Sequence, residues 1–436
     1  MHTPKPTAGD TSWFTHDRFG MFIHWGLYSQ AARHEWVQHR EEIHPDSYRK
    51  YFDHFDPDRY DPALWAAYAR EAGMKYVVLT TKHHEGFCLW DSAHTDYKAT
   101  NTPAGRDLLK PFVDAFRAEG LRVGFYYSLI DWHHPDFPID HIHPLRNHPD
   151  ATEMNESRDV SKYRTYLHAQ VEELLTAYKP DIMWFDFSYR QSPKYPHFQG
   201  KGADAWGSVE LMQKIRSICP DIIVNDRLEI GGDVITPEQY QPTSWVTRDG
   251  EPVVWEACQT FSGSWGYHRD ESSWKTPEQL IQLLVNSVAN GGNLLLNVGP
   301  TARGNFDDRA VDALAEIAEW MELNARSIYG CTASPLTPPP DCRYTTRDNR
   351  LYVHVFNWPF THLHLPGLAG KIGYAQLLHD ASEVHWAEPK QSFGHGNMLV
   401  EQANDTIVLK LPVEPPPVRC PVIELFLKEQ GGKKYV

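Results

Sequence analysis

Short apolar runs alternate with amphipathic segments through the first three hundred residues of the chain. The clearest run, Pro180-Asp181-Ile182-Met183-Trp184-Phe185-Asp186, predicts a buried parallel strand that ends abruptly in a carboxylate. Because burying an unpaired charge is costly, we expect Asp186 to have a partner or a catalytic task. Trp184 lies two residues earlier, on the same strand face, and is expected to line a pocket beside it.

The same change from apolar to polar residues recurs along the chain. Further strands are predicted within residues 20–26, 75–87, 122–128, 221–227, 253–256 and 293–300. Amphipathic helices are predicted between them, at residues 61–72, 107–119, 161–178, 208–218, 277–289 and 309–323. Strands that alternate with helices indicate a parallel sheet. Polar residues at each strand's exit favour a TIM-like (β/α) barrel, which brings all exits to one mouth.

The chain is longer than such a barrel requires. A barrel takes about 250 residues and this chain has 436, so a second domain is expected. Three consecutive prolines end the stretch 334–340, and they favour an extended linker. Short alternating runs follow at 351–356, 372–378, 398–401 and 406–411, which is typical of a small antiparallel β-sandwich. We therefore predict an α/β barrel domain over 1–333 and a β-sandwich over 341–436.

Charge and composition narrow the possible partners. A net charge of −15, without a clustered basic face, argues against nucleic acid. Neither an N-terminal apolar region nor a run of about 20 apolar residues occurs, so no membrane partner is expected and a cytoplasmic location is the default expectation. The six cysteines lack CxxC spacing and are expected to be reduced, mostly buried thiols.

Two kinds of chemistry fit the residues expected at the mouth. The first is glycoside hydrolysis with retention, which needs a nucleophilic carboxylate and a second acid about 5 Å away. Asp186 would be the nucleophile. The second acid would be Glu238, in the predicted loop 236–240, or Glu256, which follows the apolar run 253–255. A carboxylate at the mouth can also bind sugar hydroxyls, so both assignments stay open.

The second chemistry is metal-dependent hydrolysis. His141-Ile142-His143, with nearby His133, His134, Asp136 and His148, superficially resembles the His-x-His of barrel metallohydrolases. These histidines lie in a proline-rich insertion instead of at the end of a first strand. His24, His83 and His84 do follow predicted strands, where neutral imidazoles suit sugar hydroxyls as well as zinc. A metal-dependent hydrolase and an inactive carbohydrate-binding protein are the alternatives.

Eight motifs of this chain, in order, resemble those of glycoside hydrolase family 29, the retaining α-L-fucosidases. They are Phe22-Ile23-His24-Trp25-Gly26, Glu35-Trp36, Lys82-His83-His84-Glu85-Gly86-Phe87, Trp184-Phe185-Asp186, Asn225-Asp226-Arg227, Trp255-Glu256, Ser264-Trp265-Gly266-Tyr267 and Gly292-Asn293-Leu294-Leu295-Leu296-Asn297. The resemblance implies a catalytic barrel with a C-terminal β-sandwich. It implies no metal or organic cofactor, and a fucosylated oligosaccharide or glycoconjugate as substrate. A homo-oligomer is compatible with it.

The resemblance also implies roles for individual residues. Asp186 matches the nucleophile. Glu238 matches the acid/base best, because it lies between Asn225-Asp226-Arg227 and Trp255-Glu256; Glu256 is then a binding residue and the second candidate for the acid/base. The positions that match the lining of the fucose pocket are His24, Glu35, Trp36, His83, His84, Tyr127, Trp184, Arg227 and Trp265.

Overall fold

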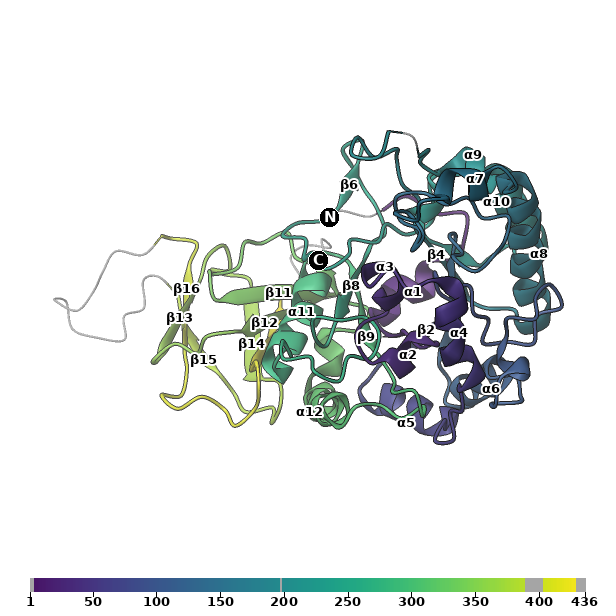
Figure 1. The fold of residues 1–436 in the computed structure, drawn as a ribbon. Coiled ribbons are helices and arrows are strands. Elements are labelled where there is room, and N and C mark those ends of the chain that lie inside the picture. The colour runs from purple at the N-terminus through teal and green to yellow at the C-terminus, as the bar shows by residue number, and fades with distance from the viewer. Residues whose placement is uncertain (1–3, 197, 389–402, 429–436) are drawn as a thin grey trace.

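A parallel β-sheet curls around the centre of the N-terminal domain (Figure 1). The computed structural model describes residues 4–196, 198–388 and 403–428. The sheet has the order β5-β4-β3-β2-β1-β9-β8. Its strands are β1 (Phe19–Ile23), β2 (Tyr76–Lys82), β3 (Arg122–Ser128), β4 (Ile182–Asp186), β5 (Ile223–Val224), β8 (Glu256–Thr260) and β9 (Asn293–Val298). Six of these seven strands occur where the apolar runs predict them.

The segment 234–238 joins the two edges of this sheet. It forms isolated parallel bridges to Asn225 on one side and to Trp255 and Cys258 on the other. The backbone N–H of Cys258 donates to the Pro237 carbonyl at 3.0 Å, which extends the ladder through the proline. The sheet thereby closes into a barrel, and the fold class predicted from the sequence is confirmed.

The seventh strand was predicted at the wrong residues. The run 253–256 was expected to end in Glu256 at the mouth, but Glu256 is the first residue of β8. It pairs with Asn293, the first residue of β9. Because parallel strands share their direction, Glu256 lies at the amino-terminal end of the barrel, which we call the floor.

Helices cover the outside of the sheet, and the six predicted ones are confirmed to within two residues at each end. They are α5 (Pro62–Glu71), α6 (Leu109–Ala118), α8 (Val160–Tyr178), α10 (Ser208–Ile218), α11 (Pro277–Ala289) and α12 (Asp308–Asn324). Their starts follow from the sequence: Asp61 caps α5, and Thr276 forms a capping box with Gln279 at α11. Each buries an apolar face against the strands.

Shorter elements fill the connections. They are α1 (Ser12–Asp17), α2 (Tyr28–Ala31), α3 (Val37–Arg40), α4 (Pro45–Asp53), α7 (Ala151–Asn155), α9 (Ala203–Trp206), the 3₁₀ turns η1 (Ala99–Asn101), η2 (Asp226–Leu228) and η3 (Ala325–Ser327), and the hairpin β6 (Thr247–Arg248) with β7 (Glu251–Pro252). The connection from β1 to β2 is the one that matters most for function, because α3 and its flanking residues lie beside the mouth of the barrel.

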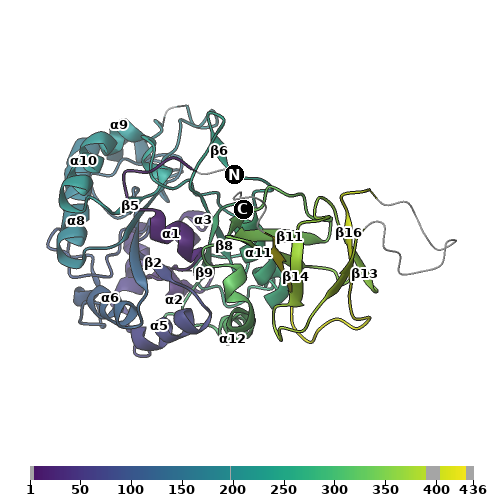
Figure 2. The same ribbon diagram turned by 180° about the vertical axis from the view of Figure 1, so that it is seen from behind.

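The C-terminal region forms two antiparallel sheets, as Figure 2 shows from behind. They have an apolar core of their own. One sheet has the order β10-β11-β12-β17-β14 and the other β13-β16-β15. Their strands are β10 (Thr332–Ala333), β11 (Cys342–Arg347), β12 (Arg350–Val355), β13 (His362–Leu365), β14 (Ile372–Leu377), β15 (His385–Ala387), β16 (Ile407–Lys410) and β17 (Val422–Leu427). The predicted run 398–401 lies outside the described residues.

The β-sandwich packs against the barrel through α11 and α12 (Figures 1 and 2). Arg343 of β11 donates to Asn286 of α11 at 2.7 Å, and Trp320 of α12 donates to the Cys420 carbonyl at 3.3 Å. The five-stranded sheet begins at β10, just ahead of the predicted linker. In the described part of the chain, no helix is long and apolar enough to cross a membrane. All six cysteines are free, and all except Cys219 are buried, as predicted.

Candidate active site

The strand exits meet at one mouth, where most of the candidate residues come together. A cavity of about 50 Å³ lies there, which we call the inner pocket. It is lined by Phe22, His24, Glu35, Trp36, His83, His84, Tyr126, Trp184, Asp186, Phe187, Glu238, Cys258 and Trp265. All the residues predicted to have a catalytic or sugar-lining role line this cavity, except Tyr127, Arg227 and Glu256.

Asp186 is the last residue of β4, and its carboxylate is held by two donors. The Tyr126 hydroxyl donates to Oδ2 at 2.8 Å, and Nη1 of Arg227 donates to Oδ1 at 2.8 Å. Only 12% of the Asp186 side chain is exposed, so these donors replace most of the water that a free carboxylate would have. The charge expected from the sequence to need a partner therefore has two.

Arg227 holds a second carboxylate as well as Asp186. Its Nη1 lies 2.9 Å from Oε2 of Glu238, and its guanidinium lies over the Trp184 ring at 4.7 Å. Burial works to lower the pKa of Arg227, but neighbouring charges, of which Asp186 is the largest, raise it above its ordinary value. The nearest oxygens of Asp186 and Glu238 share one nitrogen, so they lie within about 6 Å of each other.

Glu238 ends the segment that closes the barrel. Its side chain is 41% exposed, far more than that of Asp186, so it reaches from the inner pocket toward solvent. The sequence predicted a loop here, and the structure instead gives Glu238 a parallel bridge to Cys258. This bridge fixes the backbone of Glu238 beside a strand of the barrel.

Each of the three acids in the inner pocket stands next to a residue with strained backbone. His34 precedes Glu35 with φ of 91°, Phe187 follows Asp186 with φ of 82°, and Gln239 follows Glu238 with φ of 49°. Residues other than glycine rarely adopt positive φ, and such strain collects at functional sites. In all three places the neighbouring carboxylate lines the same cavity.

The histidines of the inner pocket are uncharged. Burial lowers the pKa of His24 to about 4, and it holds the pKa values of His83 and His84 well below their ordinary value. His24 Nδ1 bonds with Asn297 Oδ1 at 2.6 Å, and His84 Nδ1 bonds with Ser128 Oγ at 2.7 Å. Nδ1 of His83 is buried and has no hydrogen-bond partner within the described structure. A buried polar atom needs a partner, and a ligand hydroxyl can provide one.

Glu35 and Trp36 reach the pocket from the connection after β1. The Glu35 carboxylate accepts the backbone N–H of Gly266 at 2.8 Å and faces His34 Nδ1 at 3.0 Å. Burial raises the pKa of Glu35, but these two neighbours outweigh it, so the pKa lies below its ordinary value. Glu35 is therefore an ionised acceptor deep in the site.

Tyr127 was predicted to line the pocket, and the structure contradicts this. Its hydroxyl donates to Gln170 of α8 at 2.8 Å, outside the barrel. Tyr126 points inward instead, because it lies in register with Trp184 of β4 and successive side chains alternate between faces. In the sequence the two adjacent tyrosines are equivalent, so the register between β3 and β4 was needed to identify Tyr126.

We expect Tyr126→Phe and Tyr127→Phe to differ in their effect on kcat/KM, because the two side chains lie on opposite faces of β3. Loss of the Tyr126 hydroxyl removes one of the two bonds that orient Asp186, and kcat/KM should fall about tenfold or more, since hydrogen bonds to charged groups contribute about 1.5–3 kcal/mol. Tyr127→Phe should stay within about twofold of the wild type. Steady-state rates on a chromogenic aryl glycoside would measure kcat/KM of both variants. Equal losses would contradict the placement.

Glu256 was predicted to lie at the mouth, and this too is wrong. Its carboxylate lies on the barrel floor, where the Tyr76 hydroxyl donates to it. Burial raises the pKa of Glu256 to about 7. Glu256 does not line the inner pocket. From this position it supports the floor of the barrel.

The histidines of the insertion after β3 have structural roles. Nδ1 of His134, His143 and His148 each accepts a backbone N–H two residues later in the chain. Among the residues described, no group of three or more histidine, cysteine or acidic side chains is arranged to hold a metal ion. The metal-dependent alternative therefore lacks a set of ligands in the described residues.

Glu85, from the Lys-His-His-Glu motif, lies behind the pocket, and its carboxyl group has a raised pKa. Burial raises its pKa to about 8, although Tyr48 and the Leu27 N–H donate to its carboxylate. The folded state thus keeps a proton that the unfolded state loses above pH 4.5 or so.

We expect Glu85 to cost stability as the pH rises. The contribution of Glu85 to the free energy of unfolding should fall between about pH 4.5 and 8, by an amount of the order of a few kcal/mol. The buried neutral histidines His24 and His83 have the opposite effect below about pH 6.5, so the contribution is measured as a difference between variants. Glu85→Gln, neutral at every pH, should lose this contribution, whereas that of Glu256, whose pKa is also raised, stays in both proteins. Urea unfolding at both ends of this window would measure it, with exposed Glu322→Gln as the matched control. A variant that kept the wild-type pH slope would contradict the assignment.

A narrow pocket with two close carboxylates at the mouth of a (β/α) barrel defines a glycoside hydrolase. Comparisons with known sequences give the family. The family profile described as Alpha-L-fucosidase matches residues 5–326. The chain belongs to the α-L-fucosidase family.

Individual relatives agree over nearly the whole chain. Tissue alpha-L-fucosidase of Rattus norvegicus is 29% identical over 86% of this chain and 83% of its own length. Plasma alpha-L-fucosidase of Homo sapiens is 29% identical over 92% of this chain and 85% of its own. The matches therefore extend beyond the barrel into the β-sandwich.

Solved structures show the same architecture. Alpha-L-fucosidase isoenzyme 1 from Paenibacillus thiaminolyticus superposes with a TM-score of 0.88 at 44% identity, covering 96% of this chain and 99% of that one. A family 29 α-L-fucosidase from Bacteroides thetaiotaomicron, trapped as a covalent intermediate with 2-fluoro-fucosyl fluoride, has a TM-score of 0.81 at 28% identity and covers 98% of each chain.

Proposed function

We propose that this protein is an exo-acting α-L-fucosidase that hydrolyses terminal α-L-fucosides with net retention, using Asp186 as nucleophile and Glu238 as acid/base. The shared contact of both carboxylates with Arg227 carries the proposal. Retaining glycosidases place their two carboxyl groups about 5–5.5 Å apart, whereas inverting enzymes need about 6.5–9.5 Å to fit a water. The upper limit of about 6 Å between the nearest oxygens favours the retaining geometry.

In the first step a carboxylate oxygen of Asp186 attacks the anomeric carbon. The bond to the leaving oxygen breaks as Glu238 transfers its proton to that oxygen, and an ester links the sugar to Asp186. The bonds from Tyr126 and Arg227 hold the Asp186 carboxylate in a fixed orientation before attack.

In the second step Glu238 takes a proton from water, which attacks the anomeric carbon and releases Asp186. Nη1 of Arg227, which lies 2.9 Å from Oε2 of Glu238, holds this carboxylate in place for the step. Once Asp186 is an ester, Glu238 is the remaining charged partner of Nη1. In the first step Glu238 carries a proton. Its carboxyl group then leaves Nη1 of Arg227 and contacts the leaving oxygen of the substrate.

The other walls suit a deoxy sugar. Neutral His24, His83 and His84 can donate to or accept from ring hydroxyls, and ionised Glu35 can accept from them. The rings of Trp184 and Trp265 offer flat apolar surfaces for the C6 methyl and the apolar ring face. A pocket this narrow admits one terminal residue, which supports exo action.

The proposal is tested by turnover of an aryl α-L-fucoside, with the first-formed product anomer followed by NMR. We expect release of α-L-fucose as the initial anomer, and rates unaffected by a chelator. Initial release of β-L-fucose would overturn the retaining mechanism. Loss of activity with chelator would favour the metal-dependent alternative, and specific fucoside binding without turnover would favour the inactive binding protein.

A further inference from the structure

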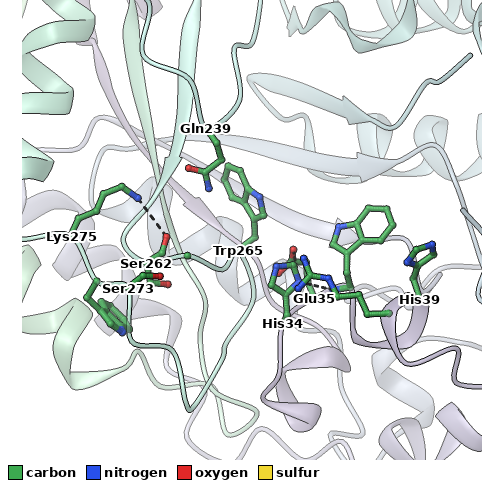
Figure 3. Close-up of a pocket in the computed structure, with 12 residues that line it drawn as sticks. His34, Glu35, His39, Gln239, Ser262, Trp265, Ser273 and Lys275 are labelled. Atoms are coloured by element: carbon green, nitrogen blue, oxygen red, sulfur yellow. Dashed lines mark hydrogen bonds and ion pairs between the residues drawn. The ribbon is translucent and has the colours of Figure 1, made fainter.

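A second, much larger cavity adjoins the inner pocket. This outer cleft has a volume of about 760 Å³ and shares the walls Glu35, Trp36 and Trp265 with the inner pocket. Its other walls include Arg40, Gln239, Trp274 and Lys275, and Figure 3 shows Gln239 and Lys275 among the residues that line it. Glu238 lines the inner pocket while Gln239, its neighbour, lines the outer cleft. The proposed proton donor therefore stands at the boundary between the two cavities, where the scissile oxygen must lie.

The walls of the outer cleft suit a sugar as leaving group. Three indole rings line it, and aromatic faces pack against the apolar faces of sugars. Trp274 is held firmly: its N–H donates to the Glu271 carbonyl at 3.2 Å, and the Arg309 guanidinium lies over its ring at 4.3 Å. Lys275 is anchored by the Thr260 carbonyl at 2.6 Å. These contacts preform the surface before a ligand arrives.

The charge of the outer cleft is opposite to that of the whole protein. The chain carries a net charge of −15, yet Arg40 and Lys275 line the cleft. Among the described residues that line it, Glu35 is the one carboxylate, and it already faces His34 and the Gly266 N–H.

Arg40 is the cation most available to a ligand. It is exposed at the end of α3, and within the described structure its guanidinium makes no hydrogen bond or ion pair. Both neighbouring acids are occupied, because Glu41 pairs with Arg33 at 2.7 Å and Glu42 with Arg146 at 2.9 Å. An anion beside Arg40 would therefore meet a free guanidinium and little competing negative charge.

We infer that the outer cleft is the leaving-group subsite and that it selects fucosides whose leaving sugar carries an anionic substituent, such as a sulfate ester or a carboxylate, which Arg40 binds. This inference rests on the proposed fucosidase activity. Arg40 acts on specificity and takes no part in bond cleavage.

Matched substrates test the inference. An α-L-fucosyl disaccharide would be compared with its counterpart sulfated on the leaving sugar, and a second pair would compare a uronic acid with its parent hexose. For the wild type we expect kcat/KM to be about three- to tenfold higher for the anionic member of each pair. The preference should shrink as salt rises from about 0.02 to 0.5 M, because screening weakens exposed ion pairs.

Variants assign the preference to one residue. In Arg40→Gln the ratio of anionic to neutral kcat/KM should fall to about one, and in Arg40→Glu below one. Arg59→Gln is the matched control, since Arg59 is also an exposed arginine but lies outside the cleft; it should keep the wild-type ratio. A wild type without anionic preference, or Arg40 variants that keep it, would overturn the inference. If the wild type hydrolyses the aryl fucoside, such a failure leaves the proposed function intact, and an enzyme inactive on every fucoside refutes both.

Discussion

Replacing Asp186 with alanine is expected to lower kcat on an aryl α-L-fucoside by about 10³-fold or more, because the covalent intermediate can no longer form. Sodium azide should restore part of the rate. The small anion fits the space left by the carboxylate and attacks the anomeric carbon from the same side. The product should be β-L-fucosyl azide, which NMR distinguishes from its α anomer.

Asp181 offers a matched control on the same strand segment. It lies just before β4 at the barrel floor, where its carboxylate accepts the Val123 N–H at 2.9 Å and pairs with Arg122 at 3.0 Å. Asp181→Ala removes the same group from the opposite end of the strand, so it should cost some stability and leave turnover in place. Wild-type-like turnover by Asp186→Ala, or α-fucosyl azide as its product, would refute the nucleophile assignment.

Much of the barrel was predictable because its elements obey simple periods. Helices such as α8 and α11 have one apolar face and clear capping residues, so their bounds follow from the sequence. Strand β4 is continuously apolar and ends in a charge, and this pattern alone predicts that Asp186 and Trp184 lie at the mouth. Such patterns depend only on residues that are close in the sequence, so they can be recognised before the fold is known.

Two predictions were wrong: which of two adjacent strand residues faces the pocket, and where one strand begins. Tyr126 and Tyr127 are adjacent and chemically identical, so only the register with β4 decides which one faces the pocket. Glu256 ends an apolar run, but β8 starts there, because the ladder with β9 begins at Glu256, whereas the Val254 carbonyl accepts the Ile235 N–H at 3.0 Å from segment 234–238. An apolar run shows that a segment is buried and does not show where its ladder begins.

Other features of the site depend on contacts between distant residues and have no local signal. Segment 234–238 includes a proline and forms only isolated bridges, so it resembles a loop in sequence. Glu35 reaches the pocket through a bond to Gly266, which lies more than two hundred residues away. The resemblance to a family identified such residues, whereas their geometry required the folded chain.

Replacing Glu238 with alanine is expected to affect the two half-reactions differently. With a sugar as leaving group, kcat/KM should fall by about 10²–10⁴-fold, because the departing oxygen must leave without a proton. With an activated aryl leaving group, formation of the ester needs little acid assistance, and the loss should appear mainly in the second step. Azide should then intercept the ester and give α-L-fucosyl azide, the anomer opposite to that expected from Asp186→Ala.

Glu256→Ala is the decisive comparison for this assignment. Glu256 contacts Tyr76 on the barrel floor and Glu238 contacts Arg227 in the pocket, so only the loss of Glu238 opens space beside the anomeric carbon. Glu256→Ala should lower the thermal midpoint, because it leaves the buried Tyr76 hydroxyl without this acceptor, and azide should not raise its rate. If azide instead rescued Glu256→Ala and gave the α-azide, the second carboxylate would have to be reassigned while Asp186 kept its role. Rescue of Glu238→Ala alone would tie proton transfer to the residue that stands between the inner pocket and the outer cleft.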